Sequence, residues 1–171
     1  MQIDKKDYDP ALHDCFRALC VRQPWADLLT VPVRQDEFGA FHADKEVEIR
    51  AKRTNYRGDL LICASAKPVL PGRPAGCTVG LVELYDCKPV REMTPDEWAD
   101  TCIPERDRPR EGYGWFVRNP RRVVEMPVKG QLGIYTIVVP KDDIMAYPRY
   151  LEIDRAGWEY IKNNLRKDGK E

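Results

Sequence analysis

The sequence lacks any apolar segment approaching the length of a bilayer span, and residues 1–9 are polar and acidic rather than apolar. We therefore expect a cytoplasmic protein with no secretory signal and no membrane partner. The six cysteines include no Cys-x-x-Cys spacing, and the two histidines form no pair with metal-ligand spacing. We accordingly expect free thiols, no metal and no other cofactor.

Several catalytic motifs are also absent. The chain has no Gly-rich phosphate loop, no Gly-x-Ser-x-Gly elbow and no His-Glu-x-x-His sequence. A Ser or Cys nucleophile would have only His13 and His42 as partners, and both lie in segments without a regular pattern. The sequence therefore offers no direct motif for the common hydrolase classes.

No single sign of charge dominates, because Lys plus Arg and Asp plus Glu both number 28. The overall charge therefore gives no indication of a polyanionic partner. Local clustering is more informative. Residues 49–58 contain four cations and no acid, and a second basic group comprises Arg118, Arg121 and Arg122. The second group predicts a basic track for a phosphate backbone, although such runs are more often solvated surface.

Hydrophobic patterning predicts several short strands and brief helices within 171 residues. The predicted strands are residues 16–21, 46–51, 59–64, 78–86, 114–117, 122–126 and 132–139. Helices are expected after Pro24, after a capping box at Thr94, and in the tail after Asp154. Residues 30–44 read as a long exposed loop. Because long crossover helices are missing, we expect a β-rich α+β fold with one domain at 16–140 and extensions at 1–15 and 141–171.

Three segments resemble the ASCH family of the PUA-like superfamily. They are the Gln-Pro-Trp helix start within residues 19–26, the alternating Lys, Glu and Arg of residues 45–50 followed by Tyr-Arg-Gly at 56–58, and the closing strands from residue 115 to 130. The resemblance implies a small β-barrel of about five to six strands with short peripheral helices and a basic cleft, to which the helix predicted after Asp154 adds a C-terminal helix. Family members are thought to bind RNA or other nucleic acids, and a few hydrolyse RNA or acylated nucleosides.

The signature strand supplies the central candidates. Glu48 and Arg50 share one strand face, where a carboxylate can accept from an exocyclic amine and a guanidinium can donate to carbonyl or phosphate oxygens. The alternative is a surface ion pair of little energetic value. The resemblance implies a base or activator at Lys45. Hydrolases of the family place a nucleophilic Thr three residues later, and Glu48 stands there instead, which argues against that route.

The other candidates are polar, basic or aromatic residues: Gln23, Trp25, Arg53, Tyr56, Arg57, Ser65 and Lys129. Basic members would hold phosphates together with Lys45, and Tyr56 would stack on a base or simply cover the barrel edge. Trp25 is expected to favour the core, and Ser65 either faces the cleft or begins a turn.

Three functions follow as hypotheses. The first is a domain that binds RNA, another nucleic acid or a modified nucleoside in its cleft. The second is a hydrolase of RNA or of an acylated nucleoside, with Lys45 as base and Glu48 as proton carrier. The third is a protein-interaction module.

Overall fold

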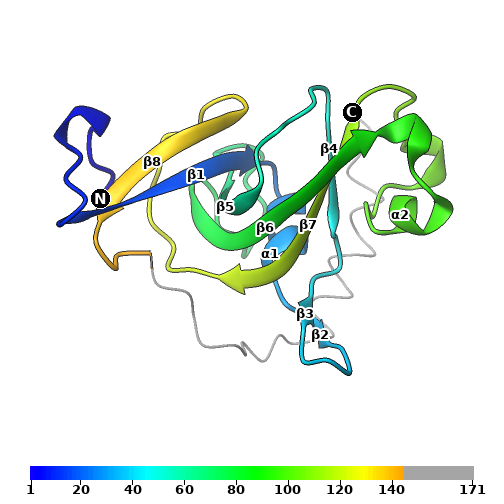
Figure 1. The fold of residues 1–171 in the computed structure, drawn as a ribbon, viewed down its shortest axis with the longest axis horizontal. Helices are drawn as coiled ribbons and strands as arrows, with labels where there is room; N and C mark the ends of the chain where they lie inside the picture. The colour runs from blue at the N-terminus through cyan, green and yellow to red at the C-terminus, as the bar shows by residue number, and fades with distance from the viewer. Residues whose placement is uncertain (145–171) are drawn as a thin grey trace.

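A mixed six-stranded sheet curls into a half-barrel in this computed structural model, which describes residues 1–144 (Figure 1). The strands are β1 (His13–Val21), β4 (Val47–Arg50), β5 (Gly58–Ala64), β6 (Cys77–Pro89), β7 (Tyr113–Arg122) and β8 (Ile134–Pro140). Their order is β4-β7-β6-β5-β1-β8, with β1 and β5 parallel and the other neighbours antiparallel. This confirms the predicted small α+β barrel. The predicted C-terminal helix lies outside the described residues, and the domain limits stay a prediction.

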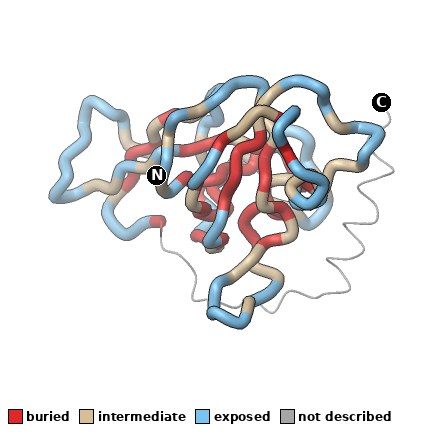
Figure 2. The backbone as a smooth tube through the Cα atoms, turned by 45° about the vertical axis from the view of Figure 1, so that its right-hand side comes forward, coloured by how far each residue is buried: buried red, intermediate tan, exposed pale blue. Residues whose placement is uncertain are grey.

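Strand β5 lies inside the sheet and is covered on both faces, as its continuous apolar sequence predicted. Leu60 and Ile62 pack in the cluster that includes α1 (Trp25–Thr30), whereas Leu61 and Cys63 pack with residues of β8. The alternation of side chains along one strand therefore joins two parts of the core. Figure 2 shows this buried region surrounded by exposed loops.

Helix α1 is too short to be stable alone, so packing has to hold it. Residues 26–30 are all buried, and the helix contacts β1, β5, β6 and β7. Gly80 of β6 permits this close approach, because a Cβ there would lie 2.4 Å from Cβ of Thr30. The helix thus fills the hollow of the half-barrel.

The second helix, α2 (Pro95–Ala99), begins at the predicted capping box. The Glu97 amide donates to the Thr94 hydroxyl at 3.3 Å, and the Thr94 amide donates to the Glu97 carboxylate at 2.9 Å. Short 3-10 helices lie at η1 (Lys5–Asp7), η2 (Val90–Glu92) and η3 (Glu105–Asp107). No helix among the described residues is long and apolar enough to cross a membrane.

Strand β7 corrects one prediction. Asn119-Pro120 was expected to separate two strand pieces, at 114–117 and 122–126, but one strand runs from Tyr113 to Arg122. The register with β6 shifts between Leu81 and Glu83, so the extra residue is absorbed as a β-bulge. Asn119 adopts a positive φ of 56°, a conformation that asparagine tolerates better than most residues. Residues 123–126 lie outside the strand.

The predicted loop at residues 30–44 contains a small hairpin instead of irregular chain alone. Its strands are β2 (Arg34–Gln35) and β3 (Phe41–His42), and it projects from the half-barrel (Figure 1). His42 lies between two acids, with Nε2 at 2.8 Å from Asp36 and Nδ1 at 3.0 Å from Glu46. The hydrogen bond with Asp36, followed by the contact with Glu46, raises the pKa of His42 against the opposing effect of burial. Two acceptors facing both ring nitrogens favour the protonated ring.

We predict that Asp36→Asn lowers the pKa of His42 because it removes the strongest of these contacts. Histidine NMR titration measures the change, and Glu37→Gln in the same loop serves as the control. Because the pKa of His42 is higher in the folded hairpin than in the unfolded chain, protonation of the ring stabilises the fold. This stabilisation is complete below pH 6.5 and is lost as the pH rises through the pKa of the folded state. A His42 pKa that is identical in wild type and Asp36→Asn contradicts the prediction.

Candidate functional site

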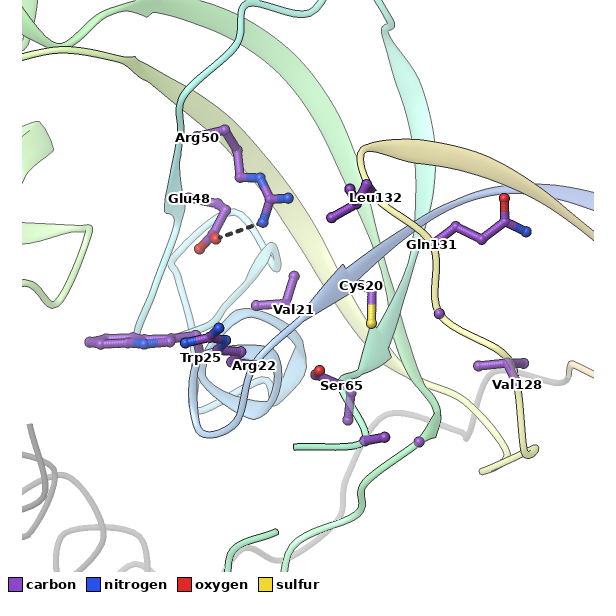
Figure 3. A pocket seen from close by; sticks show the side chains of 14 residues that line it. Cys20, Val21, Arg22, Trp25, Glu48, Arg50, Ser65, Val128, Gln131 and Leu132 are labelled. Atoms are coloured by element: carbon purple, nitrogen blue, oxygen red, sulfur yellow. Dashed lines mark ion pairs between the residues drawn. The ribbon is translucent and has the colours of Figure 1, made fainter. Parts of the chain in front are cut away.

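A cleft of about 620 Å³ opens where the parallel strands β1 and β5 end, opposite the edge strand β4 (Figure 3). The amide of Ser65 donates to the carbonyl of Val21 at 2.8 Å, which keeps the two strand ends together. The loop before β8 closes the remaining side. The lining residues are Cys20, Val21, Arg22, Trp25, Glu48, Arg50, Ala64, Ser65, Ala66, Gly76, Val128, Gly130, Gln131 and Leu132.

Glu48 of β4 contributes a carboxylate to the wall of the cleft and is only 9% exposed. One carboxylate oxygen lies 3.3 Å from Nζ of Lys45, and the other lies 3.7 Å from a guanidinium nitrogen of Arg50. Figure 3 shows the carboxylate and guanidinium side by side, with Arg50 reaching toward Leu132. Two predicted site residues therefore meet in one wall of the cleft.

Lys45 lies behind this wall and is 1% exposed, although the sequence suggested a lysine that holds a phosphate. Its ammonium donates to the carbonyl of Thr101 at 2.7 Å and lies 4.9 Å from the ring centroid of Trp25. A phosphate cannot reach the ammonium in this structure. The ammonium is thus held next to the Glu48 carboxylate by an ion pair with Glu48 and a cation–π contact with Trp25.

Arg50 is held over an aromatic surface. Its guanidinium carbon lies 5.9 Å from the ring centroid of Trp115, and the Trp115 indole donates to the carbonyl of Lys52 at 3.0 Å. The arginine side chain keeps 28% of its surface exposed. The guanidinium therefore retains donors for a ligand while Trp115 and Glu48 restrict its position.

Gln23 lies outside the cleft, which differs from the expectation for a cleft residue. Only 3% exposed, it accepts from the amide of Asp27 at 3.2 Å and donates to the carbonyl of Pro74 at 3.0 Å. Asp27, itself 1% exposed, forms ion pairs with Arg73 at 2.7 Å and Arg122 at 2.8 Å. These contacts connect α1 to the loop before β6 and to the end of β7, and so fix the position from which Trp25 reaches the cleft.

The predicted basic track on β7 is internally neutralised. Arg118 donates two hydrogen bonds to Glu83, at 3.1 and 2.9 Å. Arg121 donates to Asp59 at 2.8 Å, and Arg122 is bound to Asp27. The sequence suggested three free cations because their acidic partners are distant along the chain. The geometry gives this track no support.

Four further candidates lie outside the lining of the cleft. Arg53 is exposed, and Arg57 donates to the carbonyls of Thr54 and Tyr56. The Tyr56 hydroxyl donates to the carbonyl of Asp59, so this tyrosine closes its own turn. Lys129 is exposed at the rim, between the lining residues 128 and 130. Ser65 and Trp25, by contrast, do line the cleft.

Sequence reasoning missed several lining residues, notably Cys20, Arg22, Gln131 and Leu132. Arg22 directly precedes the Gln-Pro-Trp motif, which was the available signal. Leu132 is 98% exposed and lies in the loop before β8, although the sequence predicted that the last strand begins at this residue. Burial raises the pKa of the Cys20 thiol, against smaller opposite effects of Ser65 and Arg50. The thiol is thus a poor nucleophile.

The cleft presents a hydrogen-bond acceptor, a neighbouring donor group, a hydroxyl and apolar surface within one cavity. Such a combination suits a flat heterocycle with polar edges. Residues 1–144 contain no cluster of three or more His, Cys, Asp or Glu that could hold a metal ion. Within residues 1–144 none of the six cysteines forms a disulfide.

Two kinds of known sequence resemble this chain, a domain family and a pair of longer proteins. The family model for the ASCH domain matches residues 40–152, which include Glu48, Arg50 and the loop before β8. Activating signal cointegrator 1 of Homo sapiens is 30% identical over 145 residues, covering 70% of this chain and 22% of the relative. The Mus musculus protein of the same name is 28% identical with the same coverage. The chain thus spans 22% of the length of these curated relatives.

We predict that Lys45→Met destabilises the protein by about 3 kcal/mol, because it leaves a buried carboxylate without its nearest cation. Urea unfolding measures the loss. Lys88→Met is the matched control, since Lys88 pairs with Glu97 and packs on Phe116 but is 27% exposed. This control should lose less than about 1 kcal/mol. Equal losses in the two variants would show that the Lys45 pair has no special structural role.

Proposed function

Because the chain belongs to the ASCH domain family, whose PUA-like fold is associated with RNA binding, we propose that its cleft binds a single-stranded nucleic acid by accepting one unpaired base. The proposal covers RNA first and includes a modified base or nucleoside.

The adjacent Glu48 and Arg50 side chains carry the proposal. A base edge presents donors and acceptors within a few ångströms, and a carboxylate beside a guanidinium can satisfy both kinds of group at once. Sequence spacing suggested this pair, and their common place in the cleft wall supports it. In this account Lys45 serves as a positioning residue that holds the carboxylate.

The remaining groups supply contacts around the base. The cleft volume of about 620 Å³ lies within the usual range for small-ligand sites, so it accommodates a base with its sugar. The Ser65 hydroxyl and the Gln131 amide supply further polar groups, and Val21 and Leu132 supply apolar surface. Arg22 and Lys129 are exposed at the cleft and its rim, where phosphates would approach.

The contact between Lys45 and Glu48 at 3.3 Å supports hydrolysis of RNA or of an acylated nucleoside as a second proposal. In that mechanism Lys45 would act as the base and Glu48 would carry the proton. The bond from Lys45 to the Thr101 carbonyl weighs against it, because the ammonium would first have to leave that acceptor. Oligonucleotide degradation in a binding assay distinguishes this function from simple binding.

We predict that Arg50→Ala weakens binding of labelled single-stranded RNA about tenfold or more, because it removes charge-assisted hydrogen bonds at the cleft wall. Fluorescence polarisation at two salt concentrations gives the affinity, and single-stranded DNA and duplex RNA provide comparisons. Arg106→Ala is the matched control, because Arg106 pairs with Asp107 at 3.6 Å yet lies outside the cleft. It should retain wild-type affinity.

Three outcomes would decide against the proposal. Equal weakening in Arg50→Ala and Arg106→Ala would indicate diffuse electrostatic attraction rather than a cleft site. Cleavage of the RNA by wild-type protein would favour the hydrolase. If no oligonucleotide binds even at low salt, the domain is better tested as a protein-interaction module.

A further inference from the structure

We infer that the cleft selects guanine over the other bases, an inference that rests on the proposed binding of an unpaired base. The Glu48 carboxylate in the cleft wall would select the base. Glu48 is the acidic residue among those lining the cleft, and Arg22 and Arg50 are the basic ones. The position of Glu48 next to Arg50 defines an order of acceptor and donor along the wall.

The Glu48 carboxylate acts as an acceptor in this arrangement. Its two oxygens face the cations of Lys45 and Arg50, and a carboxylate in ion pairs offers lone pairs but no proton. It has about four lone-pair directions in total, so these contacts leave capacity for hydrogen bonds from a ligand. The ligand group opposite Glu48 must therefore donate.

Guanine is the base whose pairing edge meets this requirement most completely. Its N1–H and its 2-amino group are adjacent donors, which a carboxylate can accept together, and its O6 lies next to them as an acceptor. Arg50 sits beside Glu48 and can donate to that O6. The base and the wall then form one continuous set of charge-assisted hydrogen bonds.

Other bases satisfy the wall only in part. Adenine and cytosine each place a single amino group on this edge, next to a ring nitrogen that accepts and would repel the second carboxylate oxygen. Uracil and thymine carry one N–H between two carbonyl oxygens. Because Glu48 is only 9% exposed, an acceptor placed against it cannot be relieved by solvent. Discrimination follows from this desolvation as well as from the hydrogen bonds gained.

The apolar side chains that line the cleft favour a purine over a pyrimidine. Val21, Val128 and Leu132 line the cleft with Trp25. Leu132 is 98% exposed, so a base that enters beside it covers apolar surface that otherwise faces water. A larger ring system covers more of this surface, which also favours guanine over cytosine.

The test compares short uridine-rich RNA oligonucleotides that differ in one central base: guanosine, inosine, adenosine, cytidine or uridine. Inosine retains N1–H and O6 but lacks the 2-amino donor. We expect the guanosine oligonucleotide to bind wild-type protein about tenfold tighter than the inosine and uridine oligonucleotides, the scale of one bidentate base contact. Fluorescence polarisation at low salt measures each affinity, and a DNA series checks that the preference follows the base.

Glu48→Gln provides the matching variant, because the glutamine amide presents one acceptor and one donor in nearly the same shape. It should reduce the preference for guanosine over inosine to about twofold or less. Glu83→Gln is the control, since Glu83 is also an arginine-bound carboxylate but lies outside the cleft. Circular dichroism verifies folding, and the inosine comparison on wild-type protein remains decisive if Glu48→Gln does not fold.

The outcomes separate this inference from the function on which it rests. Equal affinities for all five oligonucleotides would overturn guanine selection while leaving nucleic-acid binding intact. Tighter binding of the cytidine oligonucleotide would also overturn it, and would show that a single amino group and a smaller ring are preferred. Absence of binding by every oligonucleotide would overturn both the inference and the proposed function.

Discussion

The buried ammonium of Lys45 is the interaction on which the cleft wall depends. It connects the carbonyl of Thr101 after α2, the indole of Trp25 in α1 and the carboxylate of Glu48 in β4. A buried charge of this kind is costly unless every partner is present, so the three elements are coupled. The Lys45 ammonium thereby holds the Glu48 carboxylate in place at the cleft wall.

The cleft itself follows from the topology of the sheet. Strands β1 and β5 are parallel neighbours, so their carboxyl ends lie together, while β4 and β8 remain the two edges of the curled sheet. The cavity draws on the parallel strand ends, on β4 and on the loop before β8. Helix α1 fills the adjacent hollow and is anchored through the ion pairs of Asp27. Fold stability and cleft geometry therefore share the same contacts.

Sequence patterns predicted the parts of the fold that depend on local chemistry. The apolar run of β5 indicated a strand covered on both faces, and Thr94 with Glu97 indicated the start of α2. Two local signals were misleading. Asn119-Pro120 is absorbed by a bulge within β7, and the polar segment before Lys45 forms a small hairpin. In both, pairing with a neighbouring strand overrode the propensity of the segment.

The sequence by itself determined the β-rich α+β class and the common strand face of Glu48 and Arg50, because these depend on periodicity and spacing within single strands. The small barrel was implied by the family resemblance. Only the tertiary structure decided that Lys45 supports the cleft from behind and that Gln23 anchors α1. It also decided that the arginines of β7 are paired with acids. The physical reason is that burial and ion pairing are set by residues far apart in the chain, and no spacing within a segment reports which distant group will lie opposite.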